Sequence, residues 1–176
     1  MIHLKITNHP VDQIESELAL LTTFNDIRPL KGSAGLVDWR LNGKLSQLIL
    51  DSRFSGQKGE ALLMPARGRV DSKEILVLGV GNKRAMNENE ISPFLHFMIE
   101  KIFLKKTKSF SLSLSDLIPG MFEWRNAVRL FVSMISGSEQ DLAVTLIEES
   151  SFVEDAKRRN MDFAYDVDVH YELIQN

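Results

Sequence analysis

The pattern that most constrains the fold is the alternation of apolar, strand-like runs with amphipathic helical segments. Two compact apolar runs, residues 61–66 and 75–80, show no polar alternation, which is typical of central strands covered on both faces by helices. Residues 91–103 then carry apolar side chains at helical spacing, with acidic residues before them and lysines after them. This alternation predicts an α/β fold of three layers, with a mixed, mostly parallel sheet between helices.

Further segments extend the pattern toward both ends of the chain. Residues 2–7 and 18–24 are predicted strands that pair near one edge of the sheet, and residues 37–51 are predicted as one helix. Gly43 inside that helix suggests the close approach of another backbone. Residues 110–114 and 142–147 are predicted strands, and residues 124–135 a helix closed by Gly137.

The last third of the chain adds a short helix and an edge strand. Ser151 and Glu154 form a capping-box pattern for a helix that ends in three basic residues. The tail, residues 165–173, alternates apolar and acidic side chains, as an edge strand with one wet face does.

Length and composition limit the classes of function. A chain of 176 residues without repeats or linkers fits a single domain, 1–176. A net charge of -3 gives no overall attraction to nucleic acid or to an anionic membrane, and no apolar run approaches the roughly 20 residues of a membrane helix. The N-terminus lacks the apolar region of a signal peptide, so we expect a cytoplasmic protein.

No catalytic residue, metal ligand or cofactor motif stands out. The absence of cysteine excludes disulfides, thiolate zinc sites and cysteine nucleophiles. The four histidines are scattered, and no GxSxG motif is present. Asp166, Asp168 and Glu172 share a strand face and could bind a hard cation, but an edge kept acidic against aggregation explains them as well.

Two glycine-bearing turns are the best candidates for a ligand site. Both fall at the carboxyl ends of predicted strands, where free backbone N–H groups and helix N-termini attract anions. A phosphate-type ligand is one interpretation of these turns, but tight turns without a ligand are the better one, because a lone GxG is a weak signal. The candidate ligand-binding residues are Gly79, Gly81, Asn82, Asp116 and Gly120, with Arg67, Arg69, Lys83 and Arg84 as possible cationic contacts.

The stretch from Arg28 to Asn82 resembles a known family. PLKGSAGLVDWRLNGKLSQLI, RFSGQKGEALLMP and EILVLGVGN occur in this order, and they are similar to the N-terminal domain of the leucine aminopeptidases, or cytosol aminopeptidases. In that family a small-residue-rich helix, an F-x-G-x-x-GE-x-LLLP segment and a strand ending in a GLG-type turn follow one another. The resemblance implies a macro-domain-like fold.

The resemblance also implies a function by binding. Catalysis in the family belongs to a larger C-terminal domain, which holds two divalent metals and carries an NTDAEGR signature that these 176 residues do not contain. We therefore expect a non-catalytic binding or regulatory module, which associates with itself or with a separate aminopeptidase subunit. The alternative is a macro-domain-type binder or hydrolase of nucleotides or ADP-ribose, although no GGGV-type loop is present.

Overall fold

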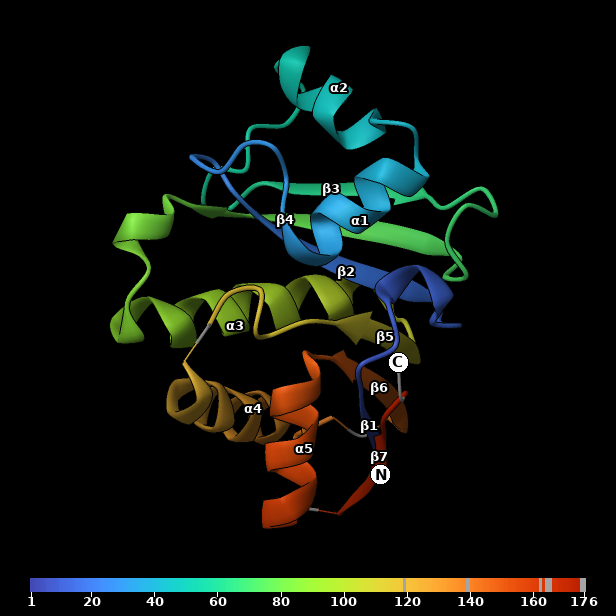
Figure 1. Cartoon of the computed structure of the whole chain (residues 1–176), viewed down its shortest axis with the longest axis vertical. Coiled ribbons are helices and arrows are strands. Elements are labelled where there is room, and N and C mark those ends of the chain that lie inside the picture. Colours follow the sequence, from blue (N-terminus) through green and yellow to red (C-terminus); the bar gives the residue numbers. More distant parts are fainter. Residues whose placement is uncertain (119, 139, 162, 164–165, 175–176) are drawn as a thin grey trace.

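The computed structural model describes residues 1–118, 120–138, 140–161, 163 and 166–174. In this part of the chain, seven strands form one sheet in the order β3-β4-β2-β5-β6-β1-β7. Figure 1 shows α1 and α2 at the β3 end of the sheet, and α4 and α5 near β6, β1 and β7 at the other end. The elements are β1 (Ile2–Thr7), η1 (Val11–Gln13), β2 (Leu18–Phe24), α1 (Gly32–Arg40), α2 (Lys44–Leu50), β3 (Ala61–Pro65), β4 (Glu74–Gly81), η2 (Lys83–Ala85), α3 (Glu88–Lys105), β5 (Ser109–Leu112), α4 (Met121–Ile135), β6 (Leu142–Ile147), α5 (Ser150–Arg159) and β7 (Val167–Glu172).

The central strands bury both of their faces, which explains their continuous apolar sequences. Leu18 and Leu20 of β2 belong to the larger core, which also contains residues of α3, α4 and α5. Ala19 and Leu21 of the same strand belong to a smaller core with α1 and α2. Since successive side chains of a strand point to opposite faces, the sheet lies between two helix layers. The three-layer α/β prediction is confirmed, and among the described strands β3 alone pairs antiparallel.

The predicted pairing of the first two strands is wrong. β2 lies between β4 and β5, whereas β1 lies between β6 and β7. Both strands run parallel to their neighbours, so the segments that join parallel strands cross over the sheet. The carboxyl ends of β1, β2, β4, β5 and β6 therefore meet at one edge. Local sequence reveals that a segment is a strand, but the order of strands depends on packing far along the chain.

The predicted helix at residues 37–51 is two helices. α1 ends at Arg40 and α2 begins at Lys44, because Asn42 and Gly43 adopt positive φ angles of 54° and 75°. Asp38 supports the break by accepting hydrogen bonds from the backbone N–H groups of Leu45 and Ser46 at 2.8 and 3.1 Å. In the described part of the chain, no neighbouring atom lies within 4 Å of a Cβ built on Gly43, so the glycine serves the left-handed turn and not a close backbone contact.

The first of the two apolar runs is not a central strand. β3 lies at the edge of the sheet and pairs with β4 alone, and its residues alternate between exposed and half-buried. β4, in contrast, has one half-buried residue followed by seven buried ones. The prediction of coverage on both faces is therefore correct for β4 and wrong for β3.

The remaining elements agree with the sequence pattern, apart from one cap. α3, α4, β5, β6 and the edge strand β7 form where they were predicted, although Tyr165 of the tail lies outside the described residues. α5 begins after Glu149 without a side-chain cap hydrogen bond, so the capping box at Ser151 is wrong. Among the described residues, none of the helices combines the length and apolar character needed to cross a membrane.

Candidate functional site

The first predicted ligand turn, at the end of β4, is covered by another loop of the same chain. The N–H of Gly79 donates to the carbonyl of Glu60 at 2.8 Å, and the N–H of Gly81 donates to the carbonyl of Gly56 at 2.9 Å. The side chain of Asn82 accepts from the N–H of Arg84 in η2. The N–H groups of both glycines are therefore already in use.

The covering loop, residues 55–60, is held in shape by the carboxylate of Glu60. This carboxylate accepts from the N–H and the hydroxyl of Ser55, at 2.9 and 2.8 Å, and from the N–H of Gln57 at 2.9 Å. Burial alone would raise the pKa of Glu60, but these hydrogen bonds lower it below its usual value. Phe54, just before this loop, is buried in the smaller core. The FSGQKGE segment therefore has a structural role, because it holds the loop against the end of β4.

The second predicted turn contains a half-buried carboxylate. Asp116 accepts a hydrogen bond from the N–H of Ser33, in the first turn of α1, at 2.9 Å. Burial raises the pKa of Asp116, and the hydrogen bond from Ser33 opposes that rise. A Cβ built on Gly32 would overlap the carboxylate of Asp116, so glycine is needed at the start of α1. Gly120 precedes α4 as its N-cap, and Pro119 of this turn lies outside the described residues.

Glu148 is a central residue of this region that was not among the predicted site residues. The residue is 4% exposed, and its carboxylate accepts from the N–H groups of Leu114 and Ser115 at 2.9 and 3.0 Å. Burial raises the pKa of Glu148 to about 7, although the hydrogen bonds from Ser115 and Leu114 oppose the rise. The available signal was an acidic residue directly after a buried strand, at the edge where parallel strands end.

Asp116 and Glu148 line one hollow of about 290 Å³ at the carboxyl ends of β1, β5 and β6. The hollow also contains His9, Ser113 and Glu149, and the start of α1 closes one side. Of the five predicted site residues, Asp116 lines this hollow, whereas Gly79, Gly81, Asn82 and Gly120 do not. The two predicted turns therefore do not form a single site.

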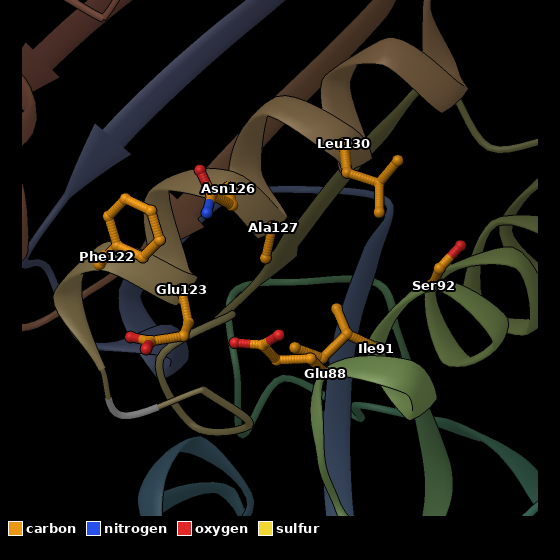
Figure 2. A pocket seen from close by; sticks show the side chains of 8 residues that line it. All are labelled: Glu88, Ile91, Ser92, Phe122, Glu123, Asn126, Ala127 and Leu130. Atoms are coloured by element: carbon orange, nitrogen blue, oxygen red, sulfur yellow. The ribbon is translucent and has the colours of Figure 1, made fainter.

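A second hollow, of about 240 Å³, lies between the start of α3 and the first turns of α4. Figure 2 shows the carboxylate of Glu88 directed toward Glu123, and Ile91, Ala127 and Leu130 also line the space between these helices. The carboxylate of Glu123 lies against Gly120 at the start of α4. Phe122 is 63% exposed at its rim. Both hollows near the predicted turn are lined by acidic groups, which repel a phosphate.

The acidic edge strand forms ion pairs with its neighbour. Glu172 pairs with Lys5 and, at 3.3 Å, with His9, and Asp168 lies 3.5 Å from His3. These contacts give the carboxylates partners on and beside β1. Among the described residues, no group of three or more histidine, aspartate or glutamate side chains is placed to hold a metal ion.

The fold is macrodomain-like. Solved structures with this fold include a Trypanosoma brucei macrodomain, with a TM-score of 0.67 and 13% identity, covering 89% of this chain and 66% of that one. An Oceanobacillus iheyensis macrodomain mutant gives 0.64 and 14%, covering 88% and 90%. A tomato leucine aminopeptidase mutant gives 0.61 and 14%, covering 91% of this chain and 36% of that chain. At these identities the likeness shows the fold alone.

The family itself is shown by sequence. The model of the cytosol aminopeptidase family, N-terminal domain, matches residues 21–138, and the chain belongs to that family. The probable cytosol aminopeptidase of Alkaliphilus metalliredigens is 26% identical over 105 residues, which are 60% of this chain and 20% of that protein. The one from Persephonella marina is 22% identical over 149 residues, 84% of this chain and 27% of that protein. The chain thus spans about a fifth to a quarter of the length of these relatives.

Proposed function

We propose that these 176 residues act by binding another protein and not by catalysis. The proposal rests on one observation: at the strand carboxyl ends, groups of the chain itself already form hydrogen bonds with backbone N–H groups. Glu148 binds the N–H groups of the loop after β5, Asp116 binds the start of α1, and residues 56 and 60 bind the end of β4. Backbone donors at strand ends and helix starts are what a macrodomain-like fold would offer to a phosphate.

The proposal has two candidate partners. One is a second copy of the chain, and the other is a separate aminopeptidase subunit, because the relatives that the chain matches carry this domain as about a fifth to a quarter of a longer aminopeptidase. Light scattering on purified protein measures self-association directly. Co-purification from the native cell distinguishes an aminopeptidase subunit from a solitary role.

A peptidase assay is the most direct test of the proposal that these residues do not act by catalysis. Purified protein with added Mn²⁺ or Zn²⁺ is expected to release no amino acid from a leucyl substrate. An activity that elutes with the protein through two different columns, and that follows its concentration, would remove the proposal.

A second candidate is a phosphate-type ligand such as a nucleotide or ADP-ribose. It is favoured by the fold, since solved macrodomains of this shape include an Oceanobacillus iheyensis mutant with ADPR and a Trypanosoma brucei macrodomain in complex with ADP. The acidic lining of the hollow at Asp116 and Glu148 opposes it.

A thermal-shift experiment separates the two candidates. A ligand present at about a hundred times its dissociation constant adds about 2.7 kcal/mol to the free energy of unfolding, or at least about 5 °C in Tm for a chain of this size. We expect no such shift with millimolar ADP-ribose, ADP or phosphate. A shift of that size with ADP-ribose would favour the second candidate.

A further inference from the structure

The outer edge of β3 carries backbone groups that have no partner in the described part of the chain. The N–H of Ala66 donates to the carbonyl of Lys73, and the N–H of Gly79 donates to the carbonyl of Glu60. In an antiparallel pair every second residue forms the hydrogen bonds of the ladder, so the backbone N–H and C=O groups of Leu62 and Met64 also point toward β4. The backbone groups of residues 61, 63 and 65 therefore point away from the sheet.

The residue types at these outward positions agree with the geometry. Pro65 has no N–H, and proline is tolerated in a strand where the missing donor would face outward. Ala61 and Leu63 keep their N–H groups, and Leu63 is 47% exposed. The edge offers two donors and three carbonyl acceptors to an added strand.

A hollow of about 510 Å³ lies beside this edge, between β3 and α2, and we name it the β3 groove. Its apolar part consists of Leu41, Leu48 and Met64. Its cationic part consists of Lys44, Arg67 and Arg69, and none of the three pairs with a carboxylate of the described residues. Unpaired cations gathered in one place are notable in a chain of net charge -3.

We propose that β3 and the β3 groove bind an extended, carboxylate-bearing segment of a partner protein. The segment adds a strand to the sheet edge through the backbone groups of Ala61 and Leu63. Every second side chain of the added strand lies on the face of the sheet that carries the Met64 side chain. On that face, apolar side chains contact the apolar part of the groove, and acidic side chains contact Arg67 and Arg69. This inference rests on the proposed function, and it adds the place of binding and the chemistry of the partner.

A second copy of the chain fits this edge poorly. Antiparallel self-pairing centred on Leu63 would set residue 67 of one copy opposite residue 59 of the other. Lys58 of each copy would then approach Arg67 and Arg69 of its neighbour, and like charges placed opposite one another are destabilising. The charge pattern therefore favours a different, acidic chain.

The test uses a defined probe, a fluorescein-labelled peptide of about seven residues in which valine and glutamate share one strand face and threonine occupies the other. Fluorescence anisotropy is expected to show binding with a Kd on the order of 100 µM, weakened by salt. Two matched peptides serve as controls: one carries lysine in place of glutamate, and the other carries N-methyl groups at alternate backbone positions. Both are expected to bind at least about tenfold more weakly, because one loses the charges and the other loses the strand pairing.

Protein variants locate the site on the chain. Arg67→Glu with Arg69→Glu is expected to weaken binding at least about tenfold, whereas Arg129→Glu with Lys157→Glu, the same charge change on α4 and α5, is expected to stay within about twofold. Leu63→Pro removes one outward N–H without touching the β4 ladder, and Leu63→Ala is its control. If Leu63→Pro lowers Tm, the N-methylated peptide supplies the same information on folded wild-type protein.

Several results would overturn the inference. Equal binding of the lysine peptide, an unchanged Kd in the Arg67 and Arg69 variant, or no anisotropy change at about 1 mM protein would each do so. Displacement of the peptide by a short single-stranded DNA at equal concentration would show a general anion site instead. If the peptide does not bind and no leucyl substrate is hydrolysed, the β3 groove is refuted as the binding site and the proposed function stands. If a leucyl substrate is hydrolysed, the proposed function itself is refuted.

Discussion

The carbonyl oxygen of Gln57 occupies the place where a side chain on Gly79 would begin. A Cβ built on Gly79 would overlap that oxygen and would lie 2.8 Å from the carbonyl carbon of Gly56. The loop of residues 55–60 therefore rests directly on the backbone of β4. This contact joins the FSGQKGE and LGVGN segments, which carry the family resemblance, and it explains why they occur together.

The first prediction follows from this contact. Gly79→Ala is expected to lower the free energy of unfolding by about 3 kcal/mol, because the added methyl group meets backbone and not a flexible side chain. Gly59→Ala is the control, since none of the described residues around it has an atom within 4 Å of a Cβ built there, and its cost comes from the positive φ of 90°. Urea unfolding measures both variants, and equal losses would mean that the contact with Gln57 is unimportant.

The second prediction concerns the break between α1 and α2. Gly43 has a φ of 75° and open space around it, so Gly43→Ala is expected to cost about 1 kcal/mol through its backbone conformation. Gly43→Asn should cost less, because asparagine tolerates the left-handed region better than alanine does. A loss for Gly43→Ala as large as that of Gly79→Ala would contradict this explanation.

Much of the fold could be predicted because it depends on local periodicity. The spacing of apolar residues in α3 and α4 and the continuous run of β4 identify these elements without knowledge of their neighbours. The position of β3 at the edge could not be found in the same way, because a short apolar run reads alike at the edge and in the centre. The pairing of β1 with β6 and β7 depends on residues more than a hundred positions away.

The candidate site was predictable only in its location. Asp116 does lie at the strand carboxyl ends, as the order of elements indicated. The partners of the backbone donors could not be predicted, because Glu148 reaches Leu114 across 34 residues and Glu60 fixes a loop whose shape depends on β4. A glycine turn in sequence does not reveal whether a ligand or the chain itself satisfies its N–H groups.

The third prediction concerns an ion-pair cluster between α4 and α5. Arg125 donates to Asp155 at 2.7 Å, and both side chains are largely buried, at 15% and 8% exposed. Burial alone would raise the pKa of Asp155, but hydrogen bonds from Arg125, Arg159 and Arg158 lower it to about 2. Arg125→Met is expected to cost about 2 kcal/mol, less than the full loss of a buried pair because two arginines remain.

Arg158→Met provides the matched comparison in the same cluster. The side chain of Arg158 is 75% exposed, so its removal is expected to cost less than about 1 kcal/mol. Urea unfolding at neutral pH measures both variants. An Arg158→Met loss that equals the Arg125→Met loss would show that burial does not decide the contribution of each arginine.

The fourth prediction is a dependence of stability on pH that arises from Glu148. The pKa of Glu148 is about 7 in the folded chain, whereas its ordinary value is 4.5. Between these pH values the folded state therefore binds more protons than the unfolded state does. The stability that comes from neutral Glu148 is fully present below about pH 4.5 and is lost as the pH rises through about 7. The raised pKa of Asp116 acts in the same direction.

We therefore expect the free energy of unfolding to fall by on the order of 3 kcal/mol between about pH 5 and pH 8 through Glu148. Glu148→Gln removes the titrating group and should flatten this part of the profile, at some cost in stability because the amide cannot accept from both Leu114 and Ser115 as the carboxylate does. Glu154→Gln, at an exposed position of α5, should leave the wild-type slope unchanged. Urea unfolding across this pH range measures all three proteins, and a Glu148→Gln profile as steep as that of the wild type would assign the pH dependence to other groups.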